Sequence, residues 1–263
     1  MIIYKSQSEI QAIRRANQVV AKILAELAEK IRPGVETREL DRYAEKRTRE
    51  MGAIPAFKGY RGYPSSLCTS INEEIVHGIP SARRLREGDI LSIDFGAILD
   101  GFYGDAAATF PVGRVTPEAQ RLIAVAQESF YKGIEKAVPG NRIGDISAAV
   151  QEYVESQGFS VIRNFVGHGI GFSLHEEPQV PNFGIPGHGP KVKPGMVLAI
   201  EPMIAVGNWD VEILSDNWTA ITRDRSLSAH YEHTIAVTRE GPKILSRLNG
   251  EADLASRKET MHA

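Results

Sequence analysis

The sequence predicts an α+β fold in which two related halves share one mostly antiparallel sheet, with helices covering one side. Three paired features support this prediction, and each recurs in the same order after 106 or 107 positions: Pro33-Gly34 with Pro139-Gly140, Gly52 with Gly158, and Gly88–Asp94 with Gly195–Glu201. In the last pair, a glycine opens an apolar strand and a carboxylate closes it six residues later. Repeats of this kind indicate two structurally similar units.

The first half reads as two helices followed by three strands. Ser8 and Gln11 form a predicted capping box, and apolar residues at helical spacing then continue to Pro33-Gly34. Thr37 is the expected cap of a second helix, which ends at Gly52. Strands are expected near 66–71, 89–96 and 102–110.

The second half repeats this order. Thr116 caps a predicted helix with Pro117 in its first turn, and Pro139-Gly140 ends it. The remaining expected elements are a helix at about 143–157 and strands near 160–166, 196–204, 211–214 and 230–238. We therefore expect a single domain over 1–250, with halves at about 8–110 and 114–238, and a polar tail at 251–263.

Composition limits the functions that the chain can have. The 42% of hydrophobic residues supply a core that needs no disulfides, and the net charge of −2 argues against nucleic-acid binding. Cys68 is the only cysteine, which excludes an internal disulfide and a cysteine-based zinc site. No signal peptide or membrane-spanning run is visible, so we expect a cytoplasmic protein.

Two aspartates lie close together in the predicted hairpin of the first half. Asp100-Gly101 is a strong two-residue turn signal, which pairs Leu99 with Phe102. This register makes Asp94 and Asp105 diagonal neighbours on one face, with Cα atoms about 7–8 Å apart. Two bare carboxylates so close repel each other, and a divalent cation removes that conflict.

Three further residues extend this candidate site. Glu201 stands at the position that the repeat relates to Asp94, His168 lies between two glycines after an apolar strand, and Glu232 lies on a predicted strand. Taken singly, these candidates have ordinary explanations: Asp94 and Asp105 as turn or edge residues bonded to backbone amides, His168 as a histidine in a tight turn, and Glu232 as an exposed strand glutamate. Taken together, four carboxylates and one imidazole can hold two divalent metals with open positions, which share a hydroxide for hydrolysis. His175 is seven residues from His168, so the spacing does not make it a ligand.

Six motifs resemble those of type I methionine aminopeptidases, and together they run from near residue 4 to near 248: NEEIVHGIP, GDILSIDFG, GFYGDAAATF, GHGIGFSLHEEP, KPGMVLAIEPM and SLSAHYEHTIAVT. The resemblance implies the two-halved pita-bread fold and the removal of an initiator methionine that precedes a small second residue. It implies two divalent ions per chain, of cobalt, manganese, iron or zinc, held by Asp94, Asp105, His168, Glu201 and Glu232. The implied partners are N-terminal methionyl peptides and nascent polypeptides, with a transient ribosome contact. No nucleic acid or membrane partner is expected, and the expected oligomeric state is a monomer.

The resemblance also implies roles for residues around these ligands. His77 contacts the substrate and holds the amide of the leaving residue, His175 donates to the scissile carbonyl, and Glu201 carries the proton. The methionine side chain is expected to bind among the following residues: Tyr60, Tyr63, Cys68, Leu174, Met203 and Trp218. Core packing is the alternative for each of these, above all for Cys68. Leu174 and Arg61 depart from the family pattern, which has a bulky aromatic residue and, in some members, a histidine there.

Three rival interpretations stay open at this point. An X-Pro aminopeptidase or prolidase shares the ligand set, but such enzymes usually carry a large domain before the catalytic one, which we do not expect here. A non-catalytic peptide- or RNA-binding homologue would have lost ligands, and all five are present. A creatinase-like hydrolase that works without metal is a third possibility, but such relatives lack the acidic ligand residues that this sequence has.

Overall fold

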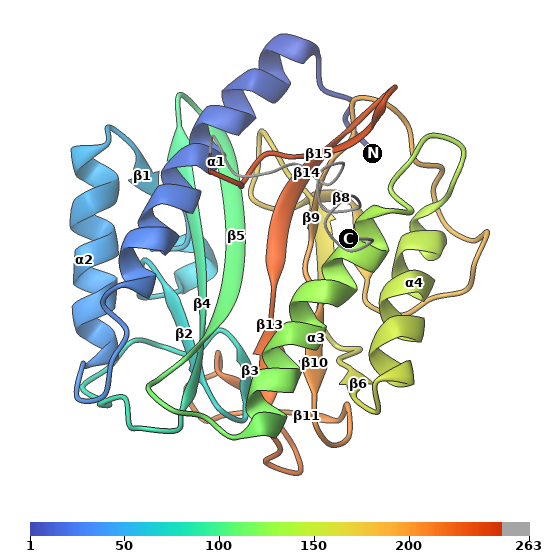
Figure 1. The fold of residues 1–263 in the computed structure, drawn as a ribbon. Coiled ribbons are helices and arrows are strands. Elements are labelled where there is room, and N and C mark those ends of the chain that lie inside the picture. The colour runs from blue at the N-terminus through green and yellow to red at the C-terminus, as the bar shows by residue number, and fades with distance from the viewer. Residues whose placement is uncertain (249–263) are drawn as a thin grey trace, which may run out of the picture.

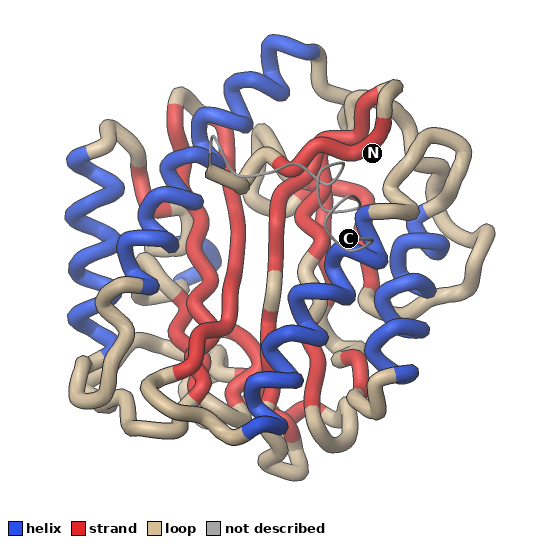
Figure 2. Tube along the Cα trace, in the orientation of Figure 1, coloured by secondary structure: helices blue, strands red, loops and turns tan. Residues whose placement is uncertain are grey.

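The computed structural model describes residues 1–248 as four helices that cover one side of a large curved sheet (Figures 1 and 2). The predicted polar tail at 251–263 lies outside the described residues, and the predicted domain limits stay a prediction. The helices are α1 (Gln7–Ala28), α2 (Thr37–Glu50), α3 (Pro117–Ile134) and α4 (Ile143–Ser156), and a short 3-10 turn spans Tyr60–Gly62. None of the helices in this part of the chain has the length and apolar character needed to cross a bilayer.

Two helix starts differ from the sequence prediction. Ser6, and not Ser8, caps α1: its Oγ accepts from the Glu9 N–H at 3.3 Å, and the Glu9 carboxylate accepts from the Ser6 N–H at 2.7 Å. A carboxylate accepts such a bond more strongly than the Gln11 amide would. Thr37 does not cap α2, because its hydroxyl bonds the backbone of Ser81 instead. Thr116 does cap α3, as predicted.

Fifteen strands are found in residues 1–248, most of them short. They are β1 (Ile54–Pro55), β2 (Cys68–Ile71), β3 (Glu74–Val76), β4 (Ile90–Leu99), β5 (Phe102–Pro111), β6 (Ser160–Val161), β7 (Val166–Gly169), β8 (Glu176–Pro181), β9 (Val197–Ile200), β10 (Met203–Ala205), β11 (Val211–Ile213), β12 (Ala220–Thr222), β13 (Ser228–His230), β14 (Glu232–Thr238) and β15 (Gly241–Ile244). The main sheet runs β1-β4-β5-β14-β9-β7-β8, with β2 beside β4 and β15 beside β14, and all its pairs are antiparallel. Two three-stranded sheets, β13-β10-β6 and β11-β12-β3, complete the fold.

Two strands that we predicted as continuous are interrupted at the centre of the molecule. The predicted strand 196–204 breaks between β9 and β10 at Glu201-Pro202, where proline cannot donate a ladder hydrogen bond. The predicted strand 230–238 breaks at Tyr231, between β13 and β14. At the first break the chain passes from the main sheet into the small sheet that contains β10 and β13, and at the second it passes back from this small sheet into the main sheet. The acidic residues Glu201 and Glu232 therefore stand where strands change partners.

The two halves have matching backbone features. Each pair of glycines that recurs in the sequence has a similar positive φ: 91° and 104° at Gly34 and Gly140, 74° and 77° at Gly52 and Gly158, 93° and 91° at Gly88 and Gly195. Helix α1 packs on β4 and β5 of the first half, and α3 packs on β10 and β13 of the second. The halves join where β5 pairs with β14. Figure 1 shows the first helix pair and the second helix pair over opposite halves of the same side of the sheet.

Candidate active site

The candidate residues lie on the face of the sheet that the helices leave free. Phe95 and Ala106 pack into the apolar core with residues of α1, so their neighbours Asp94 and Asp105 point to the opposite face. The predicted hairpin is confirmed: Leu99 pairs with Phe102, and the same register continues along both strands. Gly96 is therefore opposite Asp105, which makes Asp94 and Asp105 diagonal neighbours.

Strand register brings residues from both halves to this face. Ala107 of β5 is opposite Asp94 on one side and opposite Glu232 on the other, so these two acids flank one position of the central strand. His168 of β7 is opposite Ala199 of β9, and Ala199 lies two positions before Glu201. Alternation along β9 then places Glu201 on the same face as His168. The five residues predicted as ligands thus meet at the seam between the halves.

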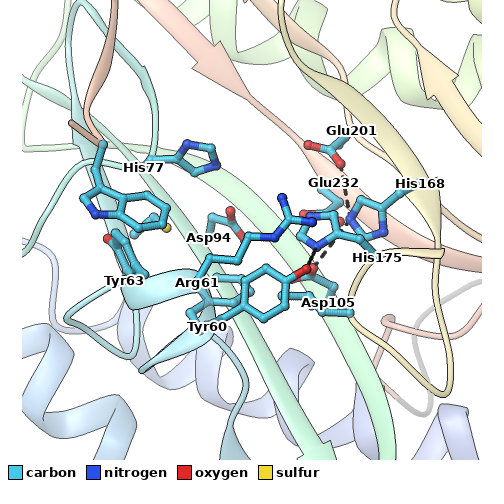
Figure 3. A pocket seen from close by; sticks show the side chains of 14 residues that line it. Tyr60, Arg61, Tyr63, His77, Asp94, Asp105, His168, His175, Glu201 and Glu232 are labelled. Atoms are coloured by element: carbon cyan, nitrogen blue, oxygen red, sulfur yellow. Dashed lines mark hydrogen bonds and ion pairs between the residues drawn. The ribbon is translucent and has the colours of Figure 1, made fainter. Parts of the chain in front are cut away.

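Distances confirm that the side chains converge. One ligand atom each from Asp105, His168 and Glu232 lies within 4.8 Å of the other two. His168 Nε2 is 3.5 Å from Glu201 Oε1 and 3.9 Å from Asp105 Oδ2. Figure 3 shows these groups pointing toward one another at one end of a pocket. Asp105, His168 and Glu232 are 4%, 6% and 2% exposed, so the cluster is deeply buried.

The buried acids have pKa values far above the usual range. Burial raises the pKa of Glu201 to about 8, and burial together with the Glu201 charge raises that of Asp94 to about 7. Burial, with the charges of neighbouring carboxylates, also raises the pKa of Asp105 and of Glu232. In addition Asp94 Oδ1, Asp105 Oδ1 and Glu232 Oε1 are buried and have no hydrogen-bond partner. A buried carboxylate oxygen without a hydrogen-bond partner costs folding free energy, unless a cation binds it.

His168 is oriented as a metal ligand would be. Its Nδ1 lies 2.9 Å from the Gly169 carbonyl oxygen, which can only accept, so Nδ1 carries the proton. The Nε2 lone pair then faces Asp105 and Glu201. Burial, with the charge of His175, lowers the pKa of His168 to about 3, which keeps the ring neutral at pH 7. A lone pair that faces carboxylates is stabilised when a cation lies between them.

His175 stands over this cluster from the loop between β7 and β8. Its ring centroid is 4.2 Å from that of His168, and it stacks on Tyr60, whose hydroxyl lies 2.9 Å from His175 Nδ1. Partial burial, with the charge of Arg61, lowers the pKa of His175 to about 4, so the ring is neutral at pH 7. A Tyr60 hydroxyl that donates to Nδ1 leaves the Nε2–H of His175 for another acceptor.

A cavity of about 160 Å³ lies above the acid cluster. Residues predicted for the methionine pocket line its walls: Tyr60, Tyr63, Cys68, Leu174 and Trp218. The Tyr63 and Trp218 rings meet edge to face at 5.0 Å. Burial raises the pKa of the Cys68 thiol, which therefore stays neutral and acts as an apolar wall. The cavity thus combines a carboxylate floor with largely apolar walls.

His77 also lines this cavity, at the end opposite His168 (Figure 3). Its φ of 62° lies in the left-handed region, which a non-glycine residue adopts only when its surroundings impose it. The ring packs against Phe165 and Trp218 at centroid distances of 5.4 and 6.2 Å. Burial, with the charges of His230 and His175, lowers the pKa of His77 to about 4.

Met203 is the one predicted pocket residue that the structure places elsewhere. It is fully buried in a small core with Ile75, Ile162 and Ala220, and it does not line the cavity. Simple alternation from Glu201 would place Met203 on the site face. The strand break at Pro202 cancels that alternation, because Met203 belongs to β10 of the small sheet.

Two residues near the site were not predicted as members of it: Phe57 lines the cavity, and His230 Nε2 lies 3.6 Å from Glu201 Oε2. Arg61, which departs from the family pattern, also lines the cavity. His230 Nε2 is buried without a hydrogen-bond partner. Its position two residues before Glu232 is a signal that the sequence offers, but the break at Tyr231 hides which face His230 occupies.

Comparison with known proteins identifies the family of this chain. The model of metallopeptidase family M24 matches residues 11–239. A methionine aminopeptidase of Clostridium acetobutylicum is 56% identical over 247 residues, which cover 94% of this chain and 99% of the relative. The chain belongs to the methionine aminopeptidases of metallopeptidase family M24.

Solved structures place this M24 chain near the methionine aminopeptidases and further from the prolidases. The methionine aminopeptidase of Thermotoga maritima superposes with a TM-score of 0.93 at 46% identity, over 94% of this chain and 100% of that one. The prolidase of Pyrococcus horikoshii gives 0.77 at 25% identity, over 95% of this chain and 65% of the prolidase. Both comparisons confirm the predicted pita-bread fold, which prolidases share.

Proposed function

We propose that this M24 chain removes the N-terminal methionine from nascent proteins and peptides, with a preference for a small second residue. The observation that carries the proposal is a cluster of four carboxylates, two of them buried and two half-buried, with one buried neutral imidazole, under a cavity with largely apolar walls. The high identity to methionine aminopeptidases supports it. A prolidase activity has no comparable support, because the prolidase above is far less similar.

Asp94, Asp105, His168, Glu201 and Glu232 are the residues that would hold two divalent ions. The donor set fits, because its oxygens are buried and unpartnered and its imidazole presents a free lone pair. Oxygen-rich sites with one histidine suit manganese, iron, cobalt or zinc. Divalent cations supply Lewis acidity at such a site, which activates water and polarises a carbonyl group.

The residues above the cluster have distinct proposed tasks. His175 donates from Nε2–H to the scissile carbonyl oxygen and stabilises the negative charge that develops there. Glu201, which lies beside His168 Nε2 at the floor of the cavity, takes a proton from the attacking water as a carboxylate and passes it to the leaving amine. His77, at the other end of the cavity, binds the amide of the leaving residue.

The cavity accounts for the proposed specificity. Tyr63, Cys68, Leu174 and Trp218 offer an apolar surface of the kind that a thioether side chain contacts well. A free amino group can lie against the acid cluster, whereas an internal methionine has an amide in its place.

The cellular setting is also part of the proposal. We expect a cytoplasmic monomer that meets nascent chains and contacts the ribosome transiently. Size-exclusion chromatography with light scattering measures the molar mass in solution and so tests whether the protein is a monomer. Co-sedimentation with translating ribosomes tests the contact with the ribosome. A stable dimer, or no co-sedimentation at any salt concentration, would contradict the corresponding part.

One assay tests the proposed reaction. Metal-stripped protein is reconstituted separately with manganese, iron, cobalt or zinc and offered the peptides Met-Ala-Ser, Met-Lys-Ser and Ala-Pro-Ser. The proposal predicts release of methionine from Met-Ala-Ser, little from Met-Lys-Ser and no cleavage of Ala-Pro-Ser. Preferred cleavage of Ala-Pro-Ser would indicate a prolidase, and no turnover with any metal would indicate a binding protein.

A further inference from the structure

A buried ion pair joins the start of the chain to the loop that carries His175. Lys5 Nζ donates to Glu176 Oε2 across 171 positions of sequence, and the two side chains are only 1% and 5% exposed. By contrast, Arg47 and Glu26, which pair between α2 and α1, are 27% and 24% exposed. Burying two charges costs solvation free energy, so such a pair adds little net stability. Its position in the fold is therefore more informative than its strength.

Glu176 closes the loop between β7 and β8 with its second oxygen. Oε1 accepts from the Phe172 N–H at 2.7 Å and from the Ser173 N–H at 3.1 Å. One carboxylate thus ties the start of this loop to its end and binds Lys5 as well. His175 is the residue immediately before Glu176, and Leu174 precedes it. Both line the cavity of the candidate active site.

Lys5 is itself fixed between this loop and the start of β9. Its backbone N–H donates to the Gly195 carbonyl oxygen at 2.7 Å. A Cβ added at Gly171 would come within 2.7 Å of Lys5 Cε, so the lysine stem passes directly beside the loop backbone. The strand that begins after Gly195 leads to Glu201. The N-terminal segment therefore spans the two chain segments that carry His175 and Glu201.

We infer that Lys5 is a positioning residue, which holds the His175 loop through Glu176 so that the imidazole lies over the acid cluster. The His175 ring has one hydrogen bond of its own, to Tyr60, and a ring contact with His168. Those contacts fix the ring only if the backbone beside it is fixed, and Glu176 provides that anchor. This inference rests on the proposed function, because it gives His175 its task in peptide cleavage.

The test uses manganese-loaded full-length protein and Met-Ala-Ser as substrate. Lys5→Met alone leaves the Glu176 charge buried and unpaired, which can unfold the chain. The informative variant is therefore Lys5→Met with Glu176→Gln, because the glutamine oxygen still accepts from Phe172 and Ser173 while the charge is gone. We expect this variant to fold and to bind manganese as the unmodified protein does, with kcat lowered about 10–100-fold and KM changed less than about 3-fold. Lys5→Arg, which keeps the cation, should retain more activity than Lys5→Met.

A double-mutant cycle separates positioning from general stability. If Lys5 acts through His175, the Lys5→Met and Glu176→Gln changes should cost less than about 3-fold in kcat once His175→Ala is present. The matched control is Arg47→Met, which breaks a pair far from the site and should leave kcat unchanged.

The inference is overturned if the effects on kcat multiply in the His175→Ala background, if the paired variant keeps full activity, or if it fails to fold. An unmodified protein that releases no methionine would refute the proposed function instead. These two failures are therefore distinguishable.

Discussion

The raised carboxyl pKa values predict that metal binding displaces protons from this protein. A carboxylic acid must lose its proton before it can bind a cation through both of its oxygens. Because Asp94 and Glu201 have pKa values of about 7 and about 8, both hold protons in metal-free protein below neutral pH. Metal affinity should therefore rise with pH across this range.

The number of protons follows from these two values. At pH 6.5 Asp94 is about three-quarters protonated and Glu201 almost fully so, which together makes about 1.7 protons. At pH 9 the same two groups would hold only about 0.1 proton. Burial and neighbouring carboxylates also raise the pKa of Asp105 and of Glu232, so these two groups increase the proton release and do not reduce it.

Isothermal titration calorimetry measures this quantity directly. Manganese is titrated into metal-free protein at pH 6.5 in buffers of different ionisation enthalpy, and the dependence of the observed heat on the buffer gives the proton count. Glu240→Gln is the control, since that exposed carboxylate has a lowered pKa and holds no proton at this pH. A release below about 0.5 proton would refute the reasoning, because the acids would then be ionised before the metal arrives.

Four further results are expected. Asp105→Asn should abolish turnover and weaken manganese binding while circular dichroism still reports a folded protein; retained turnover would count against its role as a ligand. His175→Ala should lower kcat on Met-Ala-Ser about 10²–10³-fold with little change in KM, as loss of an oxyanion donor does, and an unchanged kcat would exclude that task. His230→Gln, which keeps an N–H donor near Glu201, should bind manganese better than His230→Leu; equal affinities would show that His230 does not orient Glu201. Folding raises the pKa of Asp94 to about 7 and of Glu201 to about 8, so metal-free protein should lose stability as pH rises through 7 to 8, measured by urea unfolding, and a gain over that range would contradict the sign.

The sequence predicted the centre of the fold better than its edges. The Asp100-Gly101 turn fixed the register of β4 and β5, because a two-residue loop leaves no freedom in how the strands pair. The carboxylate at the end of each repeated strand then located Asp94 and Glu201 at the seam. Short edge strands such as β1, β3 and β15 were missed, since so few residues show no alternation.

The errors at the site have one physical cause. Strand alternation is a reliable guide only while a strand stays in one sheet. Glu201 and Pro202 separate β9 from β10, and Tyr231 separates β13 from β14, so the faces of Met203 and His230 could not be derived from their neighbours. Tyr60, Tyr63 and Trp218 come from loops and turns, and only the resemblance to a family located them in the pocket.

The account depends most on whether cations bind where the two halves of the sheet meet. Crystals grown with manganese and measured near its absorption edge give the ion positions directly by anomalous scattering. We expect anomalous density in contact with the carboxylates of Asp94, Asp105, Glu201 and Glu232 and with Nε2 of His168. Fully loaded crystals in which manganese lies only elsewhere, while these side chains remain free of it, would contradict the account.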